Sequence, residues 1–549
     1  MGSQPSDGTE VRACPPVRER RVSRILTHFL TLVRAYPASK IFPALISVAG
    51  LAFGLWIRVE FFRSFPDPIP TQDAWGYLTG VFGLLQKGQF DLFAQRTPGF
   101  PLIVWLTLIV SGSFAALNIL NGILTFIAGL AVAYVARAFG GPFRLTAALA
   151  FAFVVVHPHI LYWEHFLQTE GSFQAFFTLA LCAIALAVLR TTPRHAAAAG
   201  LLTAIAVLIR AQAMFLTPLM LLALAWTGRR LGMRKLVWLL VAAGAGPLLL
   251  LGGWSARNKV VHGFFGLSDN FPAQIFGVSG RWIDLESPAL AEDKALISDS
   301  IRRYQSMPDD LDFVLYDESG PGYLIARKYA SDPNRRDEVY SALAREAILH
   351  HPVAFAKRGL NTTYEMLFFK WAKSKGEFAF RDDHGALWFA TVEHPVEFST
   401  NSLWDQQWDY LAREFSVNQY RAAQDQATST VMSRRLTFDG HLQPVLAWET
   451  QFIRGSLIIT LIALLSLPWL SGPRRLVVTL ISVSVILLIF TAGFFSWAEQ
   501  RYLSTLHGGA ALMGALAVVG LAERWMPKVW LLELRKENES KPQVDPVQS

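Results

Sequence analysis

The sequence predicts an all-α polytopic membrane protein with about ten transmembrane helices, interfacial helices and a mainly helical domain on the outer face. Hydrophobic residues make up 52% of the 549 residues and charged residues only 17%, whereas about 25% is usual in soluble proteins. Segments of roughly 15 to 20 residues run almost without charge. Basic residues gather beside these segments, so the formal charge of +8 indicates membrane topology and not nucleic-acid binding.

The uncharged segments are the predicted spans. We expect them over residues 41–59, 115–136, 145–162, 171–189, 196–210, 213–227, 236–254, 452–470, 476–496 and 505–522. The tail before the first span is rich in arginine, which places it in the cytoplasm. With ten spans, both termini and nearly all basic loops fall on that side. This count requires that 98–112 does not cross, and its length and two prolines favour an interfacial or re-entrant helix.

These spans divide the chain into parts. We expect a basic cytoplasmic tail at 1–40, an N-terminal transmembrane catalytic module at 41–254 with an outer loop at 60–97, an outer-face domain at 255–450, C-terminal transmembrane helices at 451–522 and a cytoplasmic tail at 523–549. The apolar surface of such a chain has membrane lipids as its first partners.

The first outer loop contains TQDAWGYLTGVFGLLQKGQF (71–90). Apolar residues at helical spacing predict an amphipathic helix over 72–86 that lies in the membrane interface. Asp73 and Tyr77 are four residues apart and share a face of it. Asp73 is either a first-turn acid that offsets the helix dipole or a catalytic carboxylate. Tyr77 is either an interfacial anchor or a substrate contact.

The second outer loop, HPHILYWEHFLQTE (157–170), holds three histidines together with Glu164 and Glu170. A metal site is one interpretation, but the HPH and EH spacings match no strong ligand motif. We therefore expect solvated, titratable side chains here and no bound metal. Glu170 begins an apolar helix, where an acid also has a purely structural role.

Two arginines lie just outside spans. Arg501 in SWAEQRYLS is the one basic residue of a short outer loop, which a bound anion explains as well as pairing with Glu499 does. Arg257 in GGWSARN is either a similar anion contact or a side chain that snorkels at the membrane edge. Outer-face carboxylates and arginines together suit proton abstraction from a hydroxyl beside a held phosphate.

Five motifs in order resemble the GT-C membrane glycosyltransferases, in particular the bacterial branch related to protein O-mannosyltransferases and the lipid A aminoarabinose transferase. They are TQDAWGYL with KGQF and RTPGFPLIVWL, then HPHILYWEHFLQTEGSFQAFF, IRAQAMFLTPL, GGWSARNKVVHGFFGLSDN and AEQRYL. The resemblance covers about 41–280 and 450–522. It implies a GT-C-like fold in the bacterial inner membrane with an active site on the outer face.

The resemblance also implies an activity. A sugar would pass with inversion from a polyprenyl-phosphate donor to a hydroxyl on a lipid, glycan or protein acceptor, with no cofactor and at most weak dependence on a divalent metal. By position, Asp73 would be the base, Glu170 a supporting carboxylate, and Arg96 and Arg501 the donor phosphate ligands. Further candidate substrate contacts are Tyr77, Glu164, His165, Arg257 and Tyr502.

Two positions depart from the family pattern. Ala74 follows Asp73 where many relatives have a second acid, and Glu170 stands where they often have Asp. A transporter or a lipid or glycan flippase is the main alternative, which predicts charges near mid-span and two related halves with paired broken helices. Here the ionisable residues cluster at span ends, which favours an enzyme. An oligosaccharide ligase or polymerase is a further alternative.

Overall fold

A computed structural model describes residues 38–64, 66, 68, 74–90, 92, 95–140, 144–307, 311–315, 317–368, 380–381, 387–388, 448–495 and 500–525. Regular structure in these residues is helical, apart from the two-residue strands β1 (Phe380–Arg381) and β2 (Leu387–Trp388), which pair antiparallel. The predicted all-α class is confirmed for this part of the chain.

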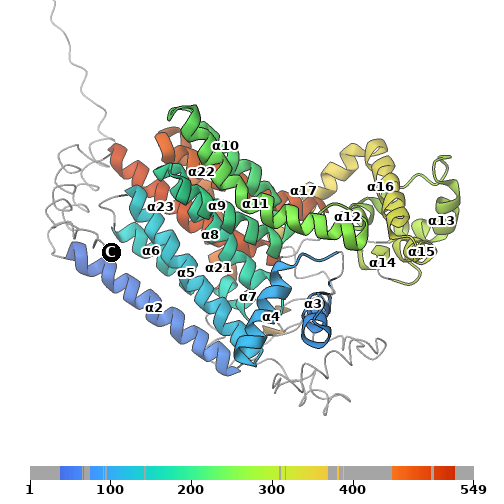
Figure 1. Cartoon of the computed structure of the whole chain (residues 1–549), viewed down its shortest axis with the longest axis horizontal. Helices are drawn as coiled ribbons and strands as arrows, with labels where there is room; N and C mark the ends of the chain where they lie inside the picture. Colours follow the sequence, from blue (N-terminus) through green and yellow to red (C-terminus); the bar gives the residue numbers. More distant parts are fainter. Residues whose placement is uncertain are drawn as a thin grey trace, which may run out of the picture.

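Eight helical segments of the described chain are long and apolar enough to cross a membrane, and they form the elongated bundle in Figure 1. They belong to α2 (Ala38–Ser64), α5 (Ala115–Gly140), α8 (Thr169–Arg190), η1 (Ala211–Phe215) with α10 (Leu216–Gly228), α11 (Met233–His262), α21 (Glu449–Ser466) with η6 (Leu467–Trp469), α22 (Gly472–Phe495), and η7 (Gln500–Thr505) with α23 (Leu506–Trp525). The chain is a multi-pass membrane protein.

The other two predicted spans are irregular. The expected span 145–162 is a bent pair, α6 (Arg144–Val156) and α7 (Pro158–Glu164), whose axes differ by 44°. Pro158 causes the break, because proline begins a helix well but cannot continue one. The expected span 196–210 is α9 (Pro193–Ile209), whose 17 residues extend about 26 Å and fall short of a bilayer core of about 30 Å.

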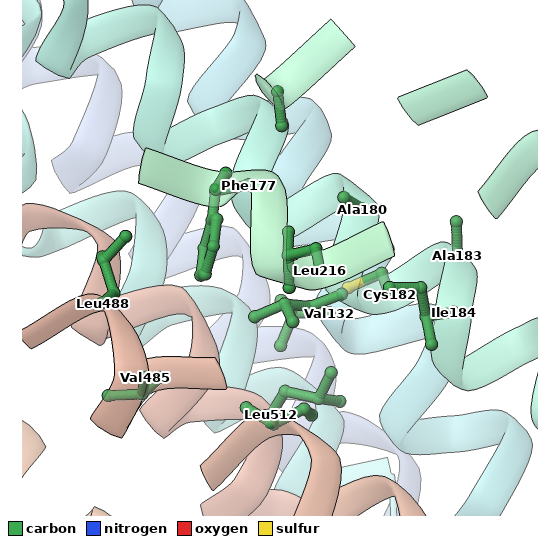
Figure 2. Close-up of a cluster of buried hydrophobic side chains, with 14 of the residues drawn as sticks. Val132, Phe177, Ala180, Cys182, Ala183, Ile184, Leu216, Val485, Leu488 and Leu512 are labelled. Atoms are coloured by element: carbon green, nitrogen blue, oxygen red, sulfur yellow. The ribbon is translucent and has the colours of Figure 1, made fainter. Parts of the chain in front are cut away.

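Helix α8 lies at the centre of the bundle, against α5, α9, α10, α22 and α23. Its apolar side chains point in several directions because neighbours cover all of its faces. Figure 2 shows part of this core, to which Phe177 and Ala180 of α8 contribute together with Leu216, Val485 and Leu512. The first turn of α8 therefore starts inside protein.

Glycines allow α9 and α11 to approach closely. A Cβ at Gly200 would lie 2.0 Å from the carbonyl oxygen of Ala243, and one at Gly246 would lie 2.8 Å from the amide nitrogen of Leu201. Small residues at such crossings are typical of helix packing in membranes. This contact fixes the middle of α9, the helix whose C-terminal end borders the candidate site.

The first loop forms α3 (Ala74–Lys87), and the short helix α4 (Gly99–Ser111) follows it, as the sequence predicts. The apolar stripe of α3, however, does not face the bilayer. Ala74, Leu78 and Val81 are fully buried, and α3 packs on α4. The prediction that this stripe faces the membrane interface was wrong, because α4 offers α3 an apolar protein surface. With 13 residues, α4 is too short to cross the bilayer.

After α11 the chain forms a helical domain with its own apolar core, which projects from the bundle on the right of Figure 1. Its elements are α12 (Asn270–Ser279), η2 (Gly280–Trp282), α13 (Ala291–Ser306), α14 (Leu311–Leu315), α15 (Pro321–Lys328) and α16 (Pro333–His350). Helix α17 (Pro352–Phe368) returns from it and packs on α22. The sequence predicted a helical domain here, and the described part is helical.

Candidate active site

The candidate site centres on an ion pair between Glu170 and Arg210. Glu170 lies in the first turn of α8 and is 1% exposed. Arg210 interrupts the helix between α9 and η1, with an extended backbone (φ −150°, ψ 113°). Its Nη1 donates to Glu170 Oε1 at 2.5 Å, and the Thr169 hydroxyl donates to Oε2 at 3.0 Å. Charge-assisted hydrogen bonds of this kind fix both side chains.

Aromatic rings border the Arg210 guanidinium. Its carbon lies 4.8 Å from the centre of the Tyr502 ring and 5.9 Å from that of Phe173. Tyr502 belongs to η7 and is 7% exposed. Rings over a guanidinium attract its charge and limit its motion. Helices α8 and η7, which lie far apart in the sequence, thus meet at the Arg210 guanidinium.

Arg96 lies on the segment that packs against Arg210. Thr97 Oγ1 donates to the carbonyl oxygen of Ile209 at 3.0 Å, so residues 96–97 lie beside 209–210. Gly99 makes this approach possible, because a Cβ there would lie 2.6 Å from the Ile209 nitrogen. The structure therefore brings two arginines, from the first loop and from the end of α9, to the same region.

Tyr77 orients the Arg96 side chain. The Arg96 Nη1 donates to the Tyr77 hydroxyl at 3.2 Å, and the guanidinium carbon lies 4.6 Å from the centre of that ring. The Tyr77 ring in turn packs edge-on against Phe100 of α4. The predicted candidates Tyr77 and Arg96 are thus in direct contact.

Arg257 holds the end of the first loop. Its Nη2 donates to the carbonyl oxygen of Phe90 at 3.0 Å, and its guanidinium carbon lies 4.7 Å from the centre of the Trp254 ring. The predicted choice was between an anion contact and a membrane-edge side chain. The structure shows a bridge between α11 and the loop that carries Arg96, and both alternatives stay predictions.

The second loop is not solvated, contrary to the prediction. Its ionisable residues, His157, His159, Glu164, His165 and Glu170, are all buried. The expectation of wet side chains was wrong because 158–164 forms helix α7, which packs between α5, α6, α8 and α21. Such polar groups need protein partners in place of water.

Glu164 finds its partner in Arg58 of α2. Arg58 donates from Nε to Glu164 Oε2 at 2.8 Å and from Nη2 to Oε1 at 2.6 Å. Its remaining nitrogen donates to the carbonyl oxygens of Gly54 and Val155. This bidentate pair joins α2 to α7, so the Glu164 carboxylate is engaged in holding two helices together.

His165 also has protein partners. Its Nδ1 donates to the carbonyl oxygen of Leu161 at 3.1 Å, and its ring lies 4.1 Å from that of Phe61. Burial lowers the pKa of His165 to about 3, because removal from water penalises the charged form. A neutral ring at this position supports packing.

Two central candidates have no described side chain. Asp73 lies outside the described residues, and only the backbone of Arg501 is described, within η7. Of the predicted residues, the structure brings Glu170 and Tyr502 together through Arg210. The Arg96 side chain contacts Tyr77, and the neighbouring Thr97 bonds the end of α9. It places Glu164, His165 and Arg257 in separate contacts.

Sequence reasoning missed Arg210 and Arg58 as site and structural residues. Both carried a signal, since Arg210 is a lone cation between two apolar runs and Arg58 ends a run of 17 residues without charge, where an unpaired charge is costly. Neither partner was evident, because the pairs span 40 and 106 residues. In the part of the chain that the structure describes, one group has metal-ligand spacing, Asp284, Glu346 and His350. It lies in the projecting domain, and the second-loop histidines do not form such a group.

No protein-family model and no curated protein sequence matches the chain. Among solved structures, the apo oligosaccharyltransferase of Archaeoglobus fulgidus is similar at 13% identity and a TM-score of 0.43, with 90% of this chain and 52% of that chain covered. ArnT from Cupriavidus metallidurans bound to undecaprenyl phosphate is similar at 14% identity and a TM-score of 0.29, with 84% and 77% covered. The chain thus spans about half the length of the archaeal enzyme. Likeness at this level assigns no activity.

Proposed function

We propose that this chain is a GT-C-type glycosyltransferase that moves a sugar from a polyprenyl-phosphate donor to a hydroxyl acceptor at the outer face of the membrane. The observation that supports the proposal is the pairing of Arg210 with the buried Glu170 against Tyr502 of η7, the turn that also carries Arg501. Thr97, next to Arg96, bonds Ile209, next to Arg210, so the chain at Arg96 runs beside this pair. Several cations at a bundle end suit a lipid phosphate, whose headgroup lies at that depth.

The proposed reaction is a single displacement. The acceptor oxygen bonds to the anomeric carbon while the bond from that carbon to the phosphate oxygen breaks, which inverts the configuration. Asp73 takes the proton of the acceptor hydroxyl. The leaving polyprenyl phosphate keeps the electron pair, and the arginines stabilise its charge, so no general acid is needed.

Glu170 has a supporting part in this scheme. Its carboxylate is engaged by Arg210 and by the Thr169 hydroxyl, so it orients a phosphate ligand and leaves proton transfer to Asp73. The proposed donor phosphate ligands are accordingly Arg96, Arg210 and Arg501.

The test uses purified protein in liposomes with labelled undecaprenyl-phosphate sugars. We expect Asp73→Asn to lose nearly all transfer, a fall of about a hundredfold or more, while donor binding stays. Asp67→Asn, a neutralisation in the same loop, is the matched control and should retain transfer. Full transfer by Asp73→Asn would end its assignment as the base.

A lipid or glycan flippase is the second candidate, because ionisable side chains such as Arg58, Glu164 and His507 are buried inside the bundle. Liposomes with a fluorescent polyprenyl-phosphate sugar and no acceptor separate the two. The glycosyltransferase account predicts no protein-dependent movement of the lipid between leaflets. Rapid movement without transfer would favour the flippase.

A further inference from the structure

A cluster of buried polar side chains lies apart from the Glu170–Arg210 pair and has no part in the proposed reaction. It comprises His157 and His159 from the start of α7, Ser456 of α21 and His507 of α23, and all four are at most 1% exposed. Burying polar groups inside a membrane bundle costs free energy unless they form hydrogen bonds with one another. The structural role of the cluster therefore follows from these bonds.

The hydrogen bonds that lead from Trp163 through His159 and His507 to Ser456 have one direction, and His157 Nε2 lies 3.4 Å from the same Ser456 hydroxyl. The Trp163 indole nitrogen can only donate, and it donates to His159 Nε2 at 2.8 Å. In a neutral His159 the proton is then on Nδ1, which donates to His507 Nε2 at 2.7 Å. By the same reasoning His507 Nδ1 donates to the Ser456 hydroxyl at 2.8 Å. Ser456 in turn donates to the carbonyl oxygen of Phe452 at 3.1 Å.

Trp163 thus fixes the tautomers of two histidines, and the chain of bonds joins α7, α23 and α21. The His157 ring stacks on His507 at 3.7 Å, which further restricts the His507 side chain. A chain in which each member both donates and accepts is more rigid than its separate bonds, because each bond polarises the next.

His507 lies two residues after η7, the turn that carries Arg501 and Tyr502. Tyr502 covers the Arg210 guanidinium. The bonds from His507 to α7 and α21 therefore hold this turn where it meets α8 and the end of α9.

We propose that His507 is a positioning residue, which fixes η7 so that Arg501 and Tyr502 stay at the donor phosphate. The expected effect on donor binding rests on the proposed function. The fixing of η7 itself can be measured with no substrate.

The first measurement is hydrogen–deuterium exchange of the η7 amides in the full-length protein. We expect His507→Leu to raise their exchange about tenfold, since two hydrogen bonds are lost. His507→Gln should restore slow exchange to within roughly threefold, because its amide can accept from His159 and donate to Ser456. Trp163→Phe should raise exchange as well, by freeing the His159 tautomer. Unchanged exchange in both His507→Leu and Trp163→Phe would overturn the proposal.

The matched control is Ser482→Ala, which removes another buried hydrogen bond to α23, through Met513. It should leave η7 exchange unchanged, and a rise equal to that of His507→Leu would reduce the effect to general loosening of α23.

The second measurement is the affinity for undecaprenyl phosphate, which should fall about tenfold in His507→Leu and recover in His507→Gln. Equal affinity in all variants would contradict the positioning role. If the wild type binds none, the proposed function fails, while the exchange data still decide on the fixing of η7.

Discussion

At the scale of single residues, Arg210 is the side chain on which the account depends most. Its guanidinium pairs with the buried Glu170 carboxylate and lies against two aromatic rings. The preceding residue, Ile209, accepts the hydrogen bond from Thr97 that anchors the first loop. Glu170 reduces the net charge of this site, so the two residues should have opposite effects on anion binding.

The first prediction concerns these opposite signs. Arg210→Gln should weaken undecaprenyl phosphate binding by about 10- to 100-fold, the value of one or two charge-assisted hydrogen bonds. Glu170→Gln should leave binding unchanged or tighten it, because it removes a negative charge and keeps a hydrogen-bond acceptor. Arg229→Gln, at the opposite end of α10, is the control for loss of an arginine. Equal weakening by Arg210→Gln and Glu170→Gln would argue against a phosphate at Arg210.

The second prediction separates a structural from a substrate role for Glu164. Glu164→Gln should lower the unfolding free energy by about 3–5 kcal/mol, since it leaves Arg58 buried without its counter-charge. The double variant Arg58→Met with Glu164→Leu should regain most of that stability, as thermal unfolding in detergent would show. If Glu164 contacts substrate, the stable double variant will lack transfer activity; we expect it to keep activity.

At the scale of elements, the sequence predicted each long helix because a charge-free run specifies a span by length alone. It misplaced the second loop and the apolar face of α3 for one reason. Periodicity shows which residues are apolar, but it does not show whether lipid, water or another helix covers them. The burial of His157 and His159 depends on α21 and α23, whose partner residues Ser456 and His507 follow 299 and 348 residues later.

A pH dependence belongs to this scale, where the loop before α12 meets α16. The Oδ2 of Asp269 lies 3.7 Å from the Nη2 of Arg336. Its other oxygen, Oδ1, is buried with no hydrogen-bond partner in the described residues. Burial, together with the nearby Asp337 carboxylate, outweighs Arg336 and raises the pKa of Asp269 to about 6. The folded state thus binds a proton more tightly than the unfolded state does.

The third prediction follows from that sign. The protonated Asp269 stabilises the domain below about pH 4, and this contribution is lost as the pH rises through about 6. Asp269→Asn should therefore gain stability relative to wild type between pH 5 and pH 7. The difference in unfolding free energy should change by about 1–2 kcal/mol, which corresponds to a few degrees in melting temperature. Asp299→Asn, at an exposed aspartate of α13, should show no such trend. A difference that is constant with pH would refute the assignment.

At the scale of the whole molecule, the fold class could be predicted, because charge-free runs and alternating topology constrain it. The central ion pair could not be predicted. Arg210 and Tyr502 meet only when α8, α9 and η7 close around each other, and no local pattern specifies that packing. The role of Asp73 stays a prediction from the sequence.

The most direct test of the account is a cryo-electron microscopy structure of the protein in nanodiscs with undecaprenyl phosphate. We expect the phosphate to lie among Arg96, Arg210 and Arg501, with the Asp73 carboxylate facing the site where a sugar would extend. A phosphate bound elsewhere on the bundle, with Arg210 still enclosed by Glu170 and Tyr502, would contradict it.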